Sequence, residues 1–245
     1  HSPWPAADLR DDLSPRRKMS AYFVTGTDTE VGKTFVTCAL LRGRSAAGRR
    51  VVGMKPVAAG TDDRGRNEDV ERLIAASNVA APRETINPYC FAAPVAPHIA
   101  AAEEGRVIRF APIHAALADL RGRADTVLVE GVGGFRVPLG PEGDTADLAQ
   151  TLGLPVILVV GLRLGCISHA LLTAEAIAAR GLRLAGWVAN QMDPAMHSVA
   201  ENVAALETAL NVPLLGRVPR IDPADPRLPA LLRWPDSDFP GRPAG

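Results

Sequence analysis

The segment at residues 26–34, GTDTEVGKT, places glycines, a lysine and a threonine in an order that can bind phosphate. A short apolar run, YFVT at residues 22–25, precedes it, and helical spacing begins at Lys33. At such a strand–loop–helix junction, backbone N–H groups and the helix N-terminus bind phosphates. Lys33 would reach the terminal phosphates, and the Thr34 hydroxyl would take a place on Mg²⁺. The segment therefore predicts a nucleoside triphosphate site.

The spacing of this loop departs from the usual pattern, which has a glycine five residues before Gly32. That position is Thr27, and the glycine, Gly26, stands one residue earlier. The alternative is a chance Gly-Lys-Thr in a turn that begins a helix. The preceding strand and the following helix favour the phosphate loop. Rossmann and kinase-type glycine loops fit worse, because neither places Gly-Lys-Thr at a helix start.

Two carboxylates are candidates for binding Mg²⁺, which takes oxygen ligands. Glu130 directly follows the apolar run TVLV and opens EGVGG, whose Gly131, Gly133 and Gly134 would let the backbone approach a ligand closely. Asp69 lies in RNEDV at a predicted helix start. An acid there can also simply stabilise the helix dipole, and the residues alone leave both interpretations of Asp69 equally open.

A lysine, an asparagine and two histidines are further candidates for functional side chains. Lys55 follows the strand VVGM and would lie beside the phosphate loop if the strand order is the usual one, where it could hold a developing anion. The alternative is an exposed lysine before a proline turn. Asn190 ends a predicted strand and could read a purine edge, although a turn residue is the simpler interpretation. His98 and His169 have no partner at ligand spacing, and neither is assigned a role.

Alternating short apolar runs and helical stretches predict an α/β fold, a P-loop NTPase-like, mostly parallel β-sheet with helices on both faces. The predicted strands are residues 22–25, 51–54, 126–129, 155–160, 184–189 and 213–215, and the predicted helices are residues 33–47, 68–76, 113–121, 168–180 and 199–210. Ligands of such sheets bind at the carboxyl ends of the strands. We expect one domain over residues 19–234, a disordered extension at 1–18 and a flexible tail at 235–245.

The composition excludes several classes of function. The 245 residues carry a formal net charge of zero and 4% aromatic residues, which argues against a nucleic-acid surface. The three cysteines, Cys38, Cys90 and Cys166, form no CxxC pair and are read as small buried residues rather than as disulfide or zinc ligands. No apolar run approaches the ~20 residues of a membrane span. A cytoplasmic protein is the expectation.

Six segments in order resemble dethiobiotin synthetase: GTDTEVGKT, GMKPVAAG, NPYCFAAPVAPHIAA, VLVEGVGG, LPVILVVGLRLGCISHALLT and LAGWVANQ. The loop alone is shared by many ATPases, but the ordered set is specific. The resemblance implies a ligase of biotin biosynthesis that forms C–N bonds. That family joins 7,8-diaminononanoate (7,8-diaminopelargonate), CO2 and ATP to give dethiobiotin, ADP and phosphate. The reaction runs through a carbamate and a carbamic-phosphoric anhydride.

The resemblance also implies roles for individual residues. ATP is bound by Glu30, Val31, Gly32, Lys33, Thr34, Phe35, Asp69, Glu130, Gly131, Val132, Gly133, Asn190, Gln191, Pro219, Arg220 and Ile221, with Asn190 at the adenine. Mg²⁺ is held by Thr34, Asp69 and Glu130. Lys55 and Lys33 are catalytic and neutralise the phosphate and the carbamate. Thr29 and Ala59 face the substrate.

The family is a homodimer whose sites are completed by the partner chain, and residues 164–169 match the part that reaches across. Two positions depart from the family pattern. Ala59 stands where the family often has a hydroxyl residue, and Ser168 replaces a common asparagine. Losing one hydrogen bond is worth ~0.5–1.5 kcal/mol, so we expect weaker diamine binding rather than a changed reaction.

Two rival functions fit less well. A cobyrinate-type amidoligase would carry a glutaminase domain, for which this chain has no room. A partitioning or targeting ATPase typically has an extra lysine near the start of the loop, and GTDTEVGKT has none before Lys33.

Overall fold

The structure is a computed structural model that describes residues 20–223 and 225–235. The predicted extension at residues 1–18 and residues 236–245 of the predicted tail lie outside this range. The predicted domain bounds therefore stay a prediction.

The centre of the molecule is a six-stranded sheet in which every neighbouring pair of strands is parallel. Its strand order is β10-β9-β8-β1-β5-β2. The strands are β1 (Ser20–Gly26), β2 (Val51–Met54), β5 (Thr126–Glu130), β8 (Val156–Leu162), β9 (Leu184–Gln191) and β10 (Leu214–Val218). This arrangement confirms the predicted α/β fold with a mostly parallel sheet.

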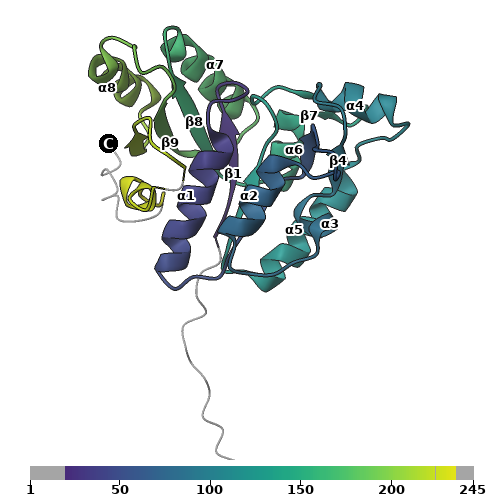
Figure 1. Cartoon of the computed structure of the whole chain (residues 1–245). Helices are drawn as coiled ribbons and strands as arrows, with labels where there is room; N and C mark the ends of the chain where they lie inside the picture. The colour runs from purple at the N-terminus through teal and green to yellow at the C-terminus, as the bar shows by residue number, and fades with distance from the viewer. Residues whose placement is uncertain (1–19, 224, 236–245) are drawn as a thin grey trace, which may run out of the picture.

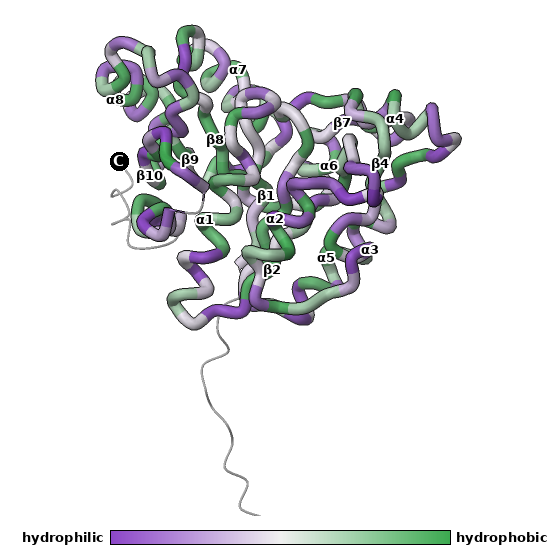
Figure 2. Tube along the Cα trace, viewed as in Figure 1, coloured by the Kyte–Doolittle hydropathy of each residue, from purple (hydrophilic) through white to green (hydrophobic). Residues whose placement is uncertain are grey.

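Helices cover both faces of this sheet (Figure 1). On one face, α1 (Lys33–Ala46) and α2 (Glu68–Ala76) lie side by side and share a core with the short 3-10 helix η1 (Leu228–Leu231). The helices α3 (Arg83–Ile86), α5 (Phe110–Arg123), α6 (Thr145–Leu152), α7 (Cys166–Ala179) and α8 (Val199–Leu210) contribute to the cores of the other face. Because both faces are covered, β8 is buried at all seven residues and hydrophobic along its length (Figure 2).

The remaining elements form the rim beside the carboxyl end of β2. They are β3 (Val57–Ala59), β4 (Tyr89–Phe91), α4 (Pro97–Glu103), β6 (Pro138–Gly140) and β7 (Gly143–Asp144). β3 pairs with β4 in parallel, and β6 pairs with β7 antiparallel. The sequence did not predict these elements, nor α3, α6 and η1. It gave α2 and α8 their observed bounds but made α5 too short at both ends.

One sequence prediction needs correction. Lys55 was expected beside the loop that follows β1, and it does line the same cavity as that loop, although β5 lies between β1 and β2 and makes Glu130 its direct neighbour. Cys38 and Cys166 are buried as predicted, whereas Cys90 is partly exposed. Within the described residues, no helix has both the length and the apolar character that crossing a membrane requires.

Candidate active site

The loop between β1 and α1 folds back on itself in a way that depends on its glycines. Gly32 has a φ of 88°, in the left-handed region that favours glycine, and Glu30 also has a positive φ of 58°. A Cβ on Gly26 would lie 2.5 Å from the Val31 side chain. Val31 packs against the end of β1, so a residue larger than glycine at position 26 would collide with it. This explains why the first glycine of the loop stands at Gly26.

The next residue, Lys33, opens α1 and is buried. Its ammonium group donates a hydrogen bond of 2.9 Å to the carbonyl oxygen of Asp28, within the same loop. Burial, and after it the positive charge of Lys55, lowers the pKa of Lys33 to about 8. The group is therefore a cation whose charge is easily lost near neutral pH and which a bound anion would stabilise.

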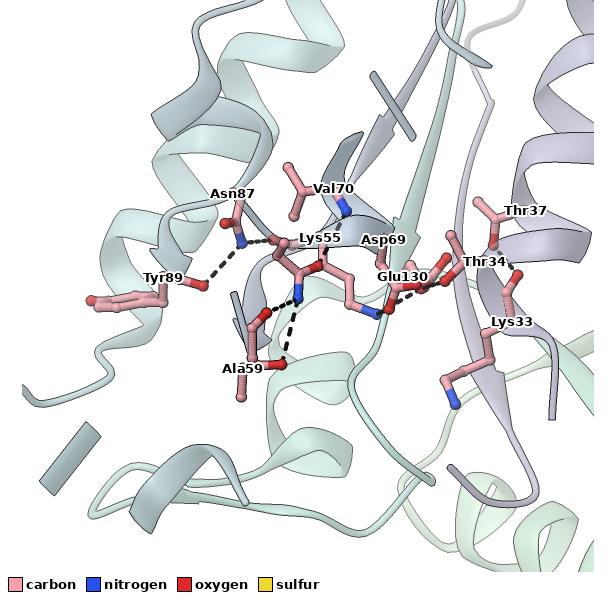
Figure 3. A network of polar contacts seen from close by, with 12 residues as sticks. Lys33, Thr34, Thr37, Lys55, Ala59, Asp69, Val70, Asn87, Tyr89 and Glu130 are labelled. Atoms are coloured by element: carbon pink, nitrogen blue, oxygen red, sulfur yellow. Dashed lines mark hydrogen bonds and ion pairs between the residues drawn. The ribbon is translucent and has the colours of Figure 1, made fainter. Parts of the chain in front are cut away.

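A second polar cluster joins the ends of β2 and β5 to the starts of α1 and α2 (Figure 3). The Lys55 ammonium group donates to Glu130 Oε1 at 2.7 Å and to Asp69 Oδ2 at 3.0 Å. Glu130 Oε1 also accepts from the Thr34 hydroxyl at 2.6 Å. The pairing of Met54 with Val129 sets this contact, since it places Lys55 and Glu130 side by side.

The charges of this cluster support one another. Burial opposes the charged form of Lys55, but Glu130 and Asp69 outweigh it and raise the pKa of Lys55. Burial likewise opposes ionisation of Asp69, while Lys55 and the Thr34 hydroxyl lower the pKa of Asp69 below its ordinary value. Lys55 and Glu130 are 3% and 0% exposed. They form a buried ion pair beneath the loop.

The oxygen atoms of this cluster suit a hard cation. Glu130 Oε2 is buried and has no hydrogen-bond partner among the described residues. The carboxylates of Asp69 and Glu130 and the hydroxyl of Thr34 converge here. The described residues hold no group of three or more His, Cys, Asp or Glu side chains that could bind a metal without further ligands. Mg²⁺ is typically bound by one or two carboxylates plus phosphates and water. The donor set therefore fits Mg²⁺ bound together with a phosphate ligand.

A cavity of about 720 Å³ opens beside the cluster. Its lining includes polar and charged residues together with phosphate-loop residues, namely Thr29, Glu30, Gly32, Lys33, Thr34, Phe35, Lys55, Glu68, Asp69 and Arg72. It also includes a mostly apolar set, namely Ala58, Ala59, Asn67, Pro94, Val95, Ala96, Pro97, Val132, Gly133 and Val137. The cavity thus offers charged groups suited to phosphates and apolar groups suited to an aliphatic chain.

Several predicted residues lie away from this cavity. Asn190 is buried, and its amide donates a hydrogen bond of 2.9 Å to the carbonyl oxygen of Val31. Asn190 therefore stabilises the conformation of the loop. Gln191 and residues 219–221 are also absent from the cavity lining. Gly131 is buried against Phe23 rather than facing the cavity. Most of the predicted phosphate-side residues line this cavity, although Val31 and Glu130 do not, and the predicted adenine-side residues are not part of its lining.

The sequence interpretation missed two buried asparagines beside the cluster. Asn67 caps α2 by accepting from Val70 N, and its amide donates to Gly60 O at 2.7 Å. Asn87 donates to the carbonyl oxygens of Lys55 and Tyr89. The signal for Asn67 was its place before the helical run EDVERL, which is typical of an N-cap. Asn87 stands in Asn-Pro, which indicates a turn but not its contacts.

Comparisons with known proteins agree with this geometry. A family model described as an AAA domain matches residues 20–227. An ATP-dependent dethiobiotin synthetase BioD of Aromatoleum aromaticum is 61% identical over 219 residues, which cover 88% of this chain and 97% of that protein. The protein of the same name from Ralstonia nicotianae is 56% identical over 211 residues, covering 85% and 92% of the two chains.

Solved structures with the same fold are more distant in sequence. A MinC:MinD cell division complex of Aquifex aeolicus matches with a TM-score of 0.50 and 17% identity over 85% of this chain and 83% of that one. A ParA family ATPase of Chlorobium tepidum matches with a TM-score of 0.52 and 11% identity over 88% and 89%. These two show the fold alone, whereas the identity to the synthetases extends over nearly their whole length. The chain therefore belongs to the ATP-dependent dethiobiotin synthetase family.

Proposed function

We propose that this protein carboxylates 7,8-diaminononanoate with CO2 and closes the ring at the expense of ATP, giving dethiobiotin, ADP and phosphate. The observation that carries the proposal is a cavity whose lining includes the phosphate loop, Lys55 and a set of apolar residues. This is the layout that a reaction needs when a terminal phosphoryl group must reach an anion on an aliphatic substrate.

The two lysines act as fixed positive charges in this scheme. Lys33 binds the terminal phosphates from within the loop, and Lys55 faces the place where a carbamate oxygen receives the phosphoryl group. Both charges favour the anions of the reaction over neutral starting groups. The two amines release protons as the carbamate forms and the ring closes, and solvent can accept them, so little proton transfer by side chains is needed and the buried lysines act through their charge.

Thr34, Asp69 and Glu130 hold Mg²⁺ in the proposed enzyme. The unpartnered Glu130 oxygen and the two converging carboxylates support this assignment. The ion supplies charge neutralisation for the phosphoryl group when bound. The residues Glu30, Val31, Gly32 and Phe35 surround the phosphates, and Asn190, Gln191, Pro219, Arg220 and Ile221 take the adenine side.

Thr29 and Ala59 face the diamine in this proposal, and both line the cavity. Ala59 offers a methyl group where a hydroxyl is common in the family, so the diamine binds with one hydrogen bond fewer. The apolar residues 94–97 cover the aliphatic part of the substrate.

The protein acts as a homodimer in this proposal, with residues 164–169 completing the partner's site. Leu164 is 97% exposed and Leu172 on α7 is 62% exposed. Only Cys166, Ala170 and Ile177 of α7 are buried. A hydrophobic helix that shows this much apolar surface fits a subunit interface. Light scattering tests it, and a monomer that stays active at nanomolar concentration would contradict a shared site.

The decisive experiment supplies the protein with ATP, Mg²⁺, bicarbonate and 7,8-diaminononanoate and measures dethiobiotin by mass spectrometry. We expect product formation together with ADP release, both dependent on the diamine. ATP hydrolysis that ignores the diamine would refute the synthetase function and favour a nucleotide switch of the partitioning type. ATP consumption that requires glutamine would favour an amidoligase.

A further inference from the structure

The backbone of Lys55 lies at a break in an edge strand. β2 ends at Met54, β3 begins at Val57, and β2 pairs only with β5 within the sheet. On its open side, the turn between α3 and β4 replaces a neighbouring strand. Lys55 N donates to Ile86 O at 2.8 Å, and Tyr89 N donates to Pro56 O at 3.0 Å. The ladder of β2 therefore continues on a turn rather than on a strand.

The side chain of Asn87 completes this ladder (Figure 3). Its amide nitrogen donates to Lys55 O at 2.6 Å and to Tyr89 O at 2.9 Å, so both N–H bonds are used on main-chain carbonyls. Asn87 is 7% exposed and does not line the cavity. Among the described residues, the hydrogen bonds of its side chain reach the site through the Lys55 backbone.

We propose that Asn87 is a positioning residue for the reaction, which fixes the Lys55 backbone so that the ammonium group stays between Glu130 and the substrate. The inference rests on the role proposed above for Lys55. The side chain of Lys55 is long, but its outer end is held by two carboxylates and its inner end by Asn87 and Ile86. A shift of the backbone would move the charge relative to the phosphoryl group, and a misplacement of about 1 Å can lower a rate about 100-fold.

The opposite end of the same strand offers a matched control. Asn78 accepts from Val51 N at 2.7 Å and donates to Ser45 Oγ and to Arg49 O, both at 2.9 Å. It therefore anchors the start of β2 as Asn87 anchors its end, with at least as many side-chain hydrogen bonds. Asn78 is exposed whereas Asn87 is buried, so a variant at Asn78 controls for the loss of side-chain hydrogen bonds to β2 while it leaves the Lys55 backbone contacts in place.

The experiment compares Asn87→Ala, Asn87→Asp, Asn87→Ser and Asn78→Ala with the unmodified protein. Thermal unfolding of each variant identifies an assay temperature at which all of them are folded, and kcat and KM for dethiobiotin formation are then measured at that temperature. We expect kcat to fall about 10- to 100-fold in Asn87→Ala, with KM for ATP changed less than about threefold. Asn87→Asp has nearly the same shape but lacks both N–H donors, so its kcat falls at least as far. Asn87→Ser keeps one donor and lies between.

Asn78→Ala should keep kcat within about twofold of the unmodified protein, even where its stability falls as far as that of Asn87→Ala. Equal kcat values for the two alanine variants at matched stability would overturn the proposal. So would an Asn87→Asp variant with full kcat across the pH range of the assay, since an ionised carboxylate cannot donate to either carbonyl. If Asn87→Ala does not fold, the kcat values of the other proteins test the proposal. They should fall from the unmodified protein to Asn87→Ser and further to Asn87→Asp, and any other order would overturn it. An unmodified protein that forms no dethiobiotin would instead reject the proposed function itself.

Discussion

The buried ion pair of Lys55 and Glu130 makes a prediction about stability that can be worked out from its surroundings. In Lys55→Met, the aliphatic part of the side chain is kept and the ammonium group is lost. Glu130 is 0% exposed, its Oε1 atom would keep only the Thr34 hydroxyl, and its Oε2 atom already has no partner among the described residues. Breaking a buried pair by removing one partner costs about 3–5 kcal/mol, because an uncompensated charge stays inside.

Removing the second charge should recover most of that loss. In Lys55→Met/Glu130→Gln, the amide can still accept from Thr34, and the fully buried carboxylate is no longer charged. Asp69 also loses its ion-pair partner, but its side chain is 40% exposed and solvent can compensate. Replacing both members of a buried pair is often close to neutral. We therefore expect the double variant to be more stable than the single one, which is the reverse of what two additive losses would give.

Urea unfolding in the absence of nucleotide, followed by tryptophan fluorescence, measures these differences, since Trp187 is fully buried. For a chain of this size about 1 kcal/mol moves the Tm by about 2–4 °C, so Lys55→Met should unfold about 6–20 °C lower. A Lys55→Met protein within about 1 kcal/mol of the unmodified one would refute the reasoning. A double variant less stable than the single one would refute it too.

Two further predictions concern binding. Burial and the charge of Lys55 lower the pKa of Lys33 to about 8, and triphosphate binding must raise it, so ATP binding at pH 8.5–9 should take up protons. Calorimetry in buffers of different ionisation enthalpy measures this uptake, and a Lys33→Met variant that takes up as many protons would assign it elsewhere. Ala59→Ser, which restores a hydroxyl to the cavity wall, should lower KM for the diamine about two- to tenfold with kcat little changed. An unchanged KM would show that the hydroxyl makes no contact with the substrate.

The sequence predicted the parts of the site that local rules determine. Glu130 was placed because a continuous apolar run ends there, and a run of that kind is a buried strand whose end faces the ligand. The amphipathic run Glu68–Ala76 gave α2 its correct bounds and put Asp69 in its first turn. Both predictions depend only on residues that are close together in the sequence.

The missed features depend on strand order and on distant contacts. The burial of Lys55 follows from β5 lying between β1 and β2, which no local pattern encodes. The ion pair of Lys55 with Glu130 joins residues 75 positions apart in the sequence. The contact of Asn190 with Val31 joins residues 159 positions apart. The helix α6 had a local signal, since Asp144 and Asp147 form its capping box, but with Asp in place of the more common Glu or Gln.

The fold alone does not account for synthetase chemistry, because the structures of a MinC:MinD complex and a ParA family ATPase share it at 17% and 11% identity. The features that the proposed function adds to this fold follow β2. There Lys55 is held by Glu130 and Asp69 and lines the same cavity as Ala58, Ala59 and residues 94–97. In the proposed function, this buried lysine, held at both ends, would keep an anion of the second substrate at a fixed place. The edge strand and the turn that supports it are therefore the part of the chain where substitutions test the proposal most directly.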